Sequence, residues 1–249
     1  YELTCRDWSS DVCSSDLPTS TDMLKRVANA SVWIAKQLGE LDEEQLRDIE
    51  IASYLCYAGK IFLPDHLIKS PVMMNGRPSN ALMFQVPNTA KEILSGIGRF
   101  KDVGMILYHL YENFDGSGFP GRIQSWQIPI GSRIIRAVLD YEEMLLNSKA
   151  SHREVFNIIQ SGSKRLYDHR IVVLLEQYTA SLEKGTANKN EIPIQIHELQ
   201  EGMVLTRDII TNSGLKILPA GAVLKENIIK KIFAHNTTDP ILGNIYVKS

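Results

Sequence analysis

The chain of 249 residues has few cysteines, no long apolar run and almost no net charge, and each absence excludes a class of protein. Its three cysteines, Cys5, Cys13 and Cys56, do not supply the dense disulfide framework of a small secreted domain. The longest aliphatic run, 171–175, is far shorter than the roughly 20 residues that cross a bilayer. With 27 basic and 29 acidic residues, the formal charge of −2 leaves no electrostatic footprint for nucleic acid or an acidic membrane. Nothing resembles a signal peptide. We therefore expect a cytoplasmic protein that binds neither nucleic acid nor membrane.

The first seventeen residues call for separate treatment. Residues 7–17 read Asp-Trp-Ser-Ser-Asp-Val-Cys-Ser-Ser-Asp-Leu, which resembles the conceptual translation of a sequencing adapter. The alternative is a genuine Ser-rich, disordered terminus. We predict that residues 1–17 are an artefact and disordered, and we leave them out of the fold prediction. Cys56 is then the only cysteine, so no disulfide is expected.

Helical periodicity dominates the next part of the chain. Apolar residues from 22 to 38 fall on one stripe, which Gly39 ends. Asp42 is expected to cap the following helix, and Ser151 with Glu154 is expected to form a capping box. Further helices are predicted at 89–97, 100–113, 131–147 and 163–182. Residues 18–182 should therefore form an all-α domain.

The composition changes after residue 182. The segment 183–191 has almost no apolar residue and is typical of a linker. Pro193 limits the first β-like run beyond it to a sheet edge, and Asn212-Ser213-Gly214 is a hairpin-type turn. The expected elements are strands at 192–196, 203–210 and 215–218 and a helix at 225–234. Residues 192–249 are therefore predicted to form a small α+β module.

The most informative segment is 112–121, which reads Glu-Asn-Phe-Asp-Gly-Ser-Gly-Phe-Pro-Gly and follows Leu110 and Tyr111. It resembles the signature of the HD-GYP family, bacterial phosphodiesterases that hydrolyse cyclic di-GMP. There the segment reads His-His-Glu, two variable residues, then Asp-Gly-Ser-Gly-Tyr-Pro. The matching signature-loop residues are Glu112, Asp115, Gly116, Ser117, Gly118, Phe119 and Pro120. The resemblance covers residues 22–146 and implies an HD-type helical bundle.

Family members hold two or three iron or manganese ions with histidine and carboxylate side chains, which activate a water for attack on phosphorus. Only Asp140 matches a family ligand here, and one carboxylate does not hold a multinuclear site. The other matching positions carry poor ligands or none: Cys56, Tyr57, Val86, Leu110 and Tyr111. We therefore expect no catalytic residue and no cofactor.

Several polar residues allow two interpretations. Lys60, in Gly-Lys after the replaced His-Asp pair, is expected either to contact phosphate or to complement a helix dipole. Arg133 is expected either to contact phosphate or, preferably, to pair with Asp140 two turns away. His109 and Glu112 are three residues apart and could share a helix face. Gly116 and Gly118 permit positive φ after the helix ends. The retention of the loop beside the replaced ligands suggests the hypothesis that folding or interaction, and not hydrolysis, depends on it.

The predicted architecture is mainly α, an HD-type helical bundle with a small C-terminal α+β module. The leading hypothesis is a catalytically degenerate HD-GYP-type signalling domain, part of a bacterial response regulator or another cyclic di-GMP signalling protein. It would act by binding a cyclic dinucleotide, a protein partner or a second copy of itself. One alternative is an active metal-dependent cyclic di-GMP phosphodiesterase that uses Asp140, Glu112, His109 and Cys56. The other is a purely structural interaction or dimerisation module.

Overall fold

The computed structural model describes residues 21–148, 150–182 and 191–248. The expected artefact at 1–17 and most of the expected linker lie outside these residues. The chain divides into two compact units, one running to Val32 and from Asp42 to Tyr167, the other made of Trp33–Leu41 and the chain from Asp168 on. This division joins the helix 169–182 to the C-terminal part. The predicted domain boundary at residue 183 lies outside the described residues and stays a prediction.

The first unit is helical and holds one two-stranded hairpin. Asp42 caps α2 in a capping box with Gln45, and Ser151 caps α7 in another with Glu154, as predicted. Its elements are α1 (Thr21–Leu38, shared with the second unit), α2 (Glu43–Tyr54), the 3-10 turn η1 (Ala58–Lys60), α3 (Asp65–Ile68), β1 (Met73–Met74), β2 (Arg77–Pro78), η2 (Ala81–Gln85), α4 (Val86–Ser95), η3 (Gly98–Phe100), α5 (Lys101–Tyr108), η4 (Ser125–Gln127), α6 (Ile130–Asn147) and α7 (His152–Ser161).

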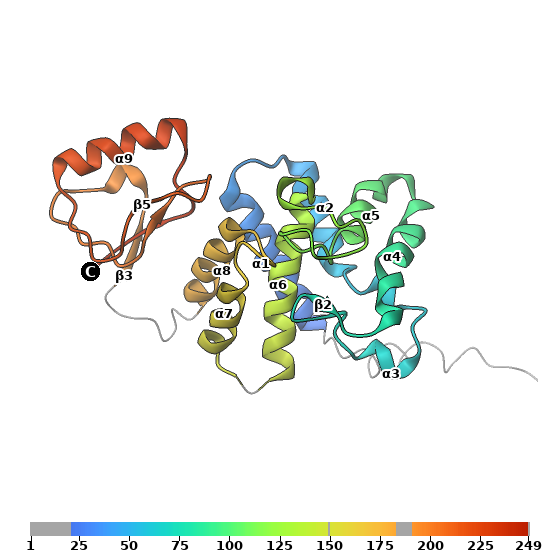
Figure 1. Cartoon of the computed structure of the whole chain (residues 1–249). Helices are drawn as coiled ribbons and strands as arrows, with labels where there is room; N and C mark the ends of the chain where they lie inside the picture. The colour runs from blue at the N-terminus through green and yellow to red at the C-terminus, as the bar shows by residue number, and fades with distance from the viewer. Residues whose placement is uncertain (1–20, 149, 183–190, 249) are drawn as a thin grey trace, which may run out of the picture. The chain divides into compact units, whose positions relative to one another are not determined.

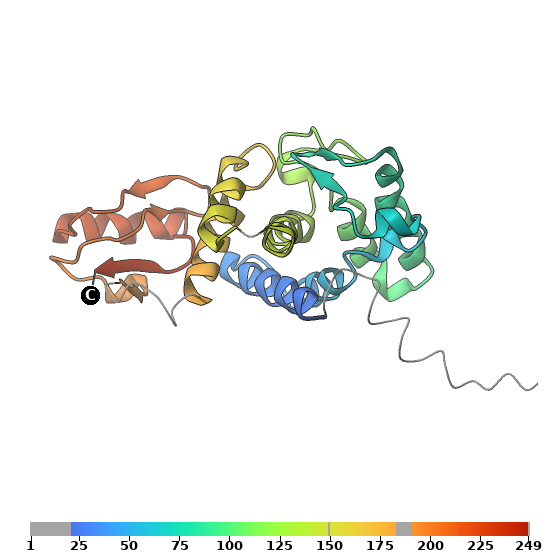
Figure 2. The same cartoon turned by 90° about the horizontal axis from the view of Figure 1, so that it is seen from below.

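Helix α6 runs through the middle of this unit (Figure 1), and Figure 2 looks almost along its axis. Gly131 lets it approach α2 and α5, because a Cβ atom there would lie 2.9 Å from Ile106 Cδ1 and 3.0 Å from Ile49 Cγ1. Ser132 Oγ donates a hydrogen bond of 2.7 Å to the Ile106 carbonyl. On another side, Arg26 Nε of α1 lies 2.7 Å from a carboxylate oxygen on α6. Residues of α6 therefore meet three different helices.

Several predicted helix boundaries differ from the structure: the helix expected at 89–97 is α4 and the helix expected at 225–234 extends to Thr238. Two further errors involve the signature loop. Helix α5 ends at Tyr108 instead of Asn113, because the loop folds back and Phe119 N donates to the Tyr111 carbonyl at 3.2 Å. The helix expected from Ser163 begins only at His169, as α8 (His169–Leu182). The intervening segment pairs with the loop instead, through hydrogen bonds from Phe114 N to Leu166 O (3.1 Å) and from Asp115 N to Arg165 O (2.9 Å). Tertiary pairing thus overrides local helix propensity.

The second unit is an α+β layer. In both views α9 lies along the small strands (Figures 1 and 2). The buried side chains between them are Leu199, Leu205, Ile209, Leu224, Ile232, Ile245 and Val247. Its elements beyond α8 are β3 (Glu191–Ile194), the 3-10 turn η6 (Ile196–Glu198), β4 (Ile209–Ile210), β5 (Lys216–Leu218), α9 (Glu226–Thr238) and β6 (Ile245–Lys248). β3 pairs antiparallel with β6, and β4 pairs antiparallel with β5.

The strand predictions for this unit are partly correct. The hairpin turn at Asn212-Ser213-Gly214 is confirmed by the β4–β5 pairing. Pro193 lies in the two-stranded β3–β6 sheet, consistent with its exclusion from a sheet interior. The expected strand 203–210 is reduced to Ile209–Ile210, and Glu191, expected as the end of the linker, is the first residue of β3.

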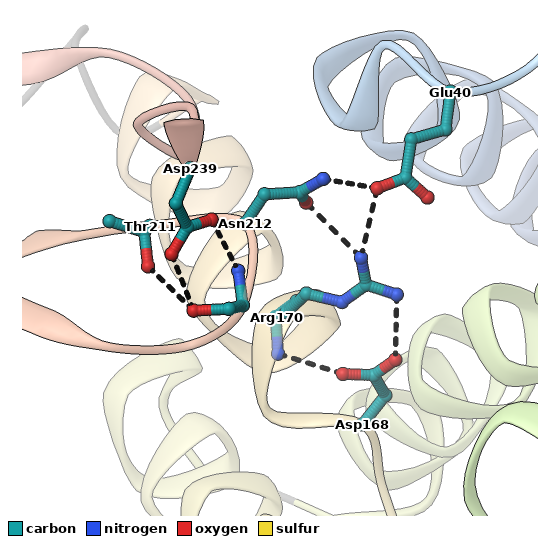
Figure 3. A network of polar contacts seen from close by, with 7 residues as sticks. Glu40, Asp168, Arg170, Thr211, Asn212 and Asp239 are labelled. Carbon is teal, nitrogen blue, oxygen red and sulfur yellow. Dashed lines mark hydrogen bonds and ion pairs between the residues drawn. The ribbon is translucent and has the colours of Figure 1, made fainter. Parts of the chain in front are cut away.

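A polar network ties elements of the second unit together (Figure 3). Arg170 Nη1 on α8 donates to Glu40 Oε1 (3.2 Å) and to Asn212 Oδ1 (3.1 Å), and its Nη2 lies 3.5 Å from Asp168 Oδ2. Asn212 also donates to Glu40. One guanidinium thus links the segment after α1, the start of α8 and the β4–β5 turn.

No helix of the described residues is long and apolar enough to cross a membrane. The predicted fold class, mainly α with a small α+β part, is confirmed.

Candidate functional site

The five positions at which the family resemblance expects ligands hold side chains that are largely buried. Cys56, Val86, Leu110 and Tyr111 are each 3% exposed or less. Burial raises the pKa of the Cys56 thiol, and it raises the pKa of Tyr111 well above its usual range. Both groups are therefore neutral at physiological pH. A neutral thiol and two aliphatic side chains offer a metal ion little.

Tyr57, at the fifth position, faces α6. Its hydroxyl donates a hydrogen bond of 2.6 Å to Glu143 Oε1. Burial raises the pKa of Glu143, and the nearby Asp140 raises it further. The Nζ of Lys60 lies 4.5 Å from the Tyr57 ring centroid and donates to the Ser70 carbonyl at 2.9 Å. Burial lowers the pKa of Lys60, and these contacts engage its ammonium within the fold.

Asp140, the one retained ligand position, has two close partners. Arg136 Nε lies 2.8 Å from its Oδ2, and the Tyr167 hydroxyl donates to the same oxygen at 2.7 Å. Arg136 is 2% exposed, and burial alone would lower its pKa, but Asp140 and the neighbouring phenols raise it overall. The guanidinium is therefore a permanent cation beside Asp140. Its carbon also lies 5.9 Å from the Tyr111 ring centroid.

This arrangement corrects one expectation. Asp140 pairs with Arg136, one turn before it, and not with Arg133. Arg133 instead donates from Nε to the Ile128 carbonyl at 2.9 Å and lies over the Trp126 ring at 5.1 Å. The side chain of Arg133 thus braces the segment that enters α6.

The signature loop is held by its own hydrogen bonds. Glu112 Oε1 accepts from Gly121 N at 2.6 Å, and Asp115 Oδ1 accepts from Ser117 N at 2.9 Å and Ser117 Oγ at 2.5 Å. Asn113 Nδ2 donates to the Gly76 carbonyl in the β1–β2 turn at 2.8 Å. The acidic residues of the motif are therefore engaged within the loop itself.

The two loop glycines have different roles. Gly116 adopts a φ of 82°, as predicted. Gly118 does not have positive φ; a Cβ atom there would lie 2.2 Å from Asn113 N and 2.5 Å from Glu112 Cα. Next to it, the Phe119 ring stacks on Tyr111 with centroids 5.8 Å apart and contacts Phe84 at 4.9 Å. Pro120 follows Phe119 through a cis peptide bond.

His109 and Glu112 do share a face, as their spacing predicts. His109 Nδ1 lies 3.5 Å from Glu112 Oε1, and the Glu112 side chain is fully buried. Because that oxygen already accepts from Gly121, the pair belongs to the loop structure.

The residues present do not fit the multinuclear iron or manganese site that the resemblance implies. Asp140 Oδ2 is occupied by a cation and a phenol. Among the described residues, no group of three or more His, Cys, Asp or Glu side chains is arranged to hold a metal ion. A cation placed at Asp140 would also face the guanidinium of Arg136 at close range, which is electrostatically unfavourable.

A cavity of about 280 Å³ opens beside Asp140. Polar groups of α6 and of the segment after α7 line one part of it, and methionine side chains line another. The lining residues that bear on its chemistry are Met73, Met144, Arg136, Asp140, Glu143 and Arg165. Cys56, Val86, Leu110 and Tyr111 do not line it. Of the five matching positions, Tyr57 contacts Glu143 and Tyr111 contacts Arg136, and these contacts join them to the surroundings of Asp140.

The sequence prediction missed three residues of this site: Arg136, Glu143 and Tyr167. The first two carried a signal, because 136, 140 and 143 are charged residues spaced four and three apart on one predicted helix. Tyr167 carried none, since it lies 27 residues from Asp140 in the sequence.

Comparison with known proteins agrees with this fold. The family model described as HD domain matches residues 8–171, about two thirds of the chain. The cyclic di-GMP phosphodiesterase response regulator RpfG of Xanthomonas campestris pv. campestris is 34% identical over 169 residues, which are 65% of this chain and 44% of that protein. A cyclic di-GMP phosphodiesterase of Thermotoga maritima is 25% identical over 158 residues, 59% of this chain and 41% of that one. The chain thus spans less than half the length of the curated relatives it matches.

A solved structure agrees at the level of the fold. The cyclic GMP-AMP specific phosphodiesterase V-cGAP3 of V. cholerae aligns with a TM-score of 0.50 and 19% identity, over 64% of this chain and 44% of that one. The family model matches about two thirds of the chain, and the structure shows a helical bundle with the signature loop. The chain therefore belongs to the HD domain family.

Proposed function

We propose that this HD domain takes part in bacterial cyclic di-GMP signalling by binding, and that it does not hydrolyse the diester. The observation that carries the proposal is the pairing of Asp140 with Arg136 and Tyr167. Hydrolysis in metal-dependent phosphodiesterases needs a cation that activates water. Here a side-chain cation already neutralises the carboxylate at which such an ion would bind.

The named relatives support the choice of ligand. Two of them are named for cyclic di-GMP and a third, matched in fold, for cyclic GMP-AMP. RpfG is also named a response regulator, which supports a role in signal transduction. We therefore take a cyclic dinucleotide as the first ligand to test.

An active phosphodiesterase is the second candidate. It is favoured by the 34% identity with a protein named as such an enzyme. It requires Asp140 to exchange Arg136 for metal, with Glu112, His109 and Cys56 as further ligands. It predicts near-stoichiometric iron, manganese or zinc in the purified protein and a linear product from cyclic di-GMP.

A module that binds no nucleotide is the third candidate. Phe84, 52% exposed, contacts Phe119 of the loop, and Trp126, 60% exposed, contacts Phe114. Two exposed aromatic rings beside one loop favour a protein partner at this place.

One experiment separates the three. The protein, beginning at Pro18, is purified without chelator, analysed for iron, manganese and zinc, and incubated with cyclic di-GMP, with RpfG as the active control. The proposal expects no metal, no linear product, and a thermal stabilisation that grows with ligand, about 2.7 kcal/mol at 100 times Kd. Metal that is lost on Asp140→Ala, together with turnover, would establish the second candidate. No metal and no stabilisation would leave the third.

A further inference from the structure

The cavity beside Asp140 has features of a ligand site that the proposed signalling role does not specify. It lies wholly within the first unit, among the β1–β2 hairpin, α6, α7 and the segment up to Tyr167. Its volume of about 280 Å³ is at the lower limit of pockets that enclose small organic molecules, about 300–1,000 Å³. It is therefore suited to a molecule of at most about one nucleotide, and not to a whole cyclic dinucleotide.

One residue that lines the cavity carries an unsatisfied donor. Arg136 is 2% exposed, and its Nη1 is buried without a hydrogen-bond partner among the described residues. A buried donor left unpaired costs about 1–3 kcal/mol, which an acceptor from a ligand would recover. An oxygen atom bound next to Arg136 would meet this need.

A second guanidinium lies at the same cavity. Arg165 is exposed, and within the described part of the chain no carboxylate pairs with it. The charges of Arg136 and Asp140 cancel in their ion pair. The two other ionisable groups that line it are Arg165 and Glu143, and the Glu143 side chain already accepts a hydrogen bond from the Tyr57 hydroxyl. Both carboxyl groups of the lining are therefore partnered, whereas within the described part of the chain Arg136 Nη1 has no hydrogen-bond partner and Arg165 has no carboxylate partner.

Apolar side chains complete the lining. Met73 and Met144 contribute flexible thioethers, which adapt to irregular ligand shapes, and Ile158 and Leu166 contribute aliphatic groups. We propose that this cavity binds a small organic monoanion, with its charged oxygens at Arg136 and Arg165 and its apolar body against Met73 and Met144. The inference rests on the proposed function, because it requires Arg136 and not a metal ion at Asp140.

Two pairs of probes test the charge requirement. Phenylacetate and its neutral amide compare a carboxylate with an uncharged isostere, and cyclic GMP and guanosine compare a phosphodiester with an uncharged nucleoside. Titration calorimetry on the whole chain is expected to show at least one anion binding about tenfold more tightly than its neutral partner. A factor of ten is the effect expected when the neutral probe loses one charge-assisted hydrogen bond. The pair that responds identifies the anion as carboxylate or phosphodiester. Equal affinities within both pairs, or no binding of any probe at millimolar concentration, would overturn the inference.

Substitution of a lining arginine tests whether the anion binds in this cavity. Arg165→Gln should weaken binding of the responsive anion about tenfold, whereas Arg153→Gln, which removes an exposed charge on α7 away from the cavity lining, should leave it within about twofold. Since Arg165 is exposed, neither change threatens folding. If Arg165→Gln binds as tightly as the unaltered protein, the cavity is not the site.

Metal analysis of the same samples distinguishes two kinds of failure. Metal at Asp140 would overturn both the proposed function and this inference. A metal-free protein that binds no monoanion would overturn this inference alone.

Discussion

The hydroxyl of Tyr57 and the carboxylate of Glu143 form a hydrogen bond of 2.6 Å between η1 and α6. Tyr57 stands where the family resemblance expects an aspartate ligand, and Glu143 is a residue that the resemblance does not mark. The bond therefore gives a structural role to a position at which the resemblance implies a metal ligand and this chain has none.

Tyr57→Phe removes this donor and leaves the partly buried Glu143 carboxylate without it. We expect the free energy of unfolding to fall by about 1–3 kcal/mol, measured by urea denaturation. Tyr54→Phe is the matched control, because Tyr54 is 42% exposed; it should change stability by less than about 0.5 kcal/mol. Equal effects of the two substitutions would contradict a specific role for the Tyr57 hydroxyl.

Glu143 should also make stability depend on pH. Burial and Asp140 raise the pKa of Glu143 in the folded state, whereas Tyr57, Lys60 and Arg136 lower it. The first two effects are larger, so the folded-state pKa lies above the usual 4.5. The folded state then binds the proton more tightly, so the contribution of Glu143 is fully present below pH 4.5 and is lost as the pH rises through the folded-state pKa. Glu143→Gln should therefore gain stability relative to the unaltered protein as the pH rises above 4.5, as followed by urea denaturation at several pH values.

Glu154 supplies a control of opposite sign. Hydrogen bonds from Ser151 lower the pKa of Glu154, so its contribution is present above pH 4.5 and is lost as the pH falls through its folded-state pKa. Glu154→Gln should accordingly lose stability relative to the unaltered protein at higher pH. Parallel profiles for the two variants would refute the assignment for Glu143.

Arg136→Met should be strongly destabilising. It leaves Asp140 partly buried without its cation, a change that costs about 3–5 kcal/mol in comparable ion pairs. The double change Arg136→Met with Asp140→Leu should recover part of this loss, because neither charge is then left unpaired. Chemical denaturation of both variants provides the measurement. A double variant no more stable than the single one would show that Asp140 does not need Arg136.

The loop glycines should respond unequally to alanine. Gly118→Ala places a Cβ 2.2 Å from Asn113 N, a backbone atom that cannot move alone, and we expect a loss of more than about 2 kcal/mol. Gly116→Ala places a Cβ 3.3 Å from Gln124 Cβ and 3.5 Å from the Arg122 carbonyl, and it should cost about 1–2 kcal/mol through its positive φ. Gly98→Ala, with open space around it, is the control for unfolding experiments. A Gly118 variant as stable as the Gly98 variant would show that the loop relaxes freely.

Arg170→Met tests the network of Figure 3. It removes the bonds to Glu40 and Asn212 and leaves Asp168, 2% exposed, without its guanidinium. We expect a loss of about 3–5 kcal/mol and faster amide exchange at the start of α8 and in the β4–β5 turn. Lys230→Met, which breaks the exposed Lys230–Glu226 pair, should change neither quantity appreciably. If amide exchange at the β4–β5 turn is unchanged in the Arg170→Met variant, Arg170 does not couple this turn to α8.

The sequence predicted the helices whose ends are set locally. Asp42 and Ser151 define their helix starts through side-chain hydrogen bonds to nearby backbone, and such signals are visible within four residues. The end of α5 was missed because it depends on the approach of Gly118 to Glu112, which is a tertiary contact. The partner of Asp140 was missed for a related reason. Residues 133 and 136 both precede it at helical spacing, and burial of the guanidinium of Arg136 decides between them.

The hydrogen bonds that Glu112, Asp115 and Ser117 make within the loop bear on how protein families are counted. A search that recognises this loop detects a segment in which Glu112 accepts from Gly121 N and Asp115 accepts from Ser117 N, while Asn113 donates to the carbonyl of Gly76 in the β1–β2 turn. Such a segment can persist in a lineage for the sake of its shape after the chemistry nearby has been lost. If the proposed function holds, a census of diester hydrolases that scores the loop alone will include this chain, and a count of enzymes needs the residues at 56, 57, 110 and 111 as well.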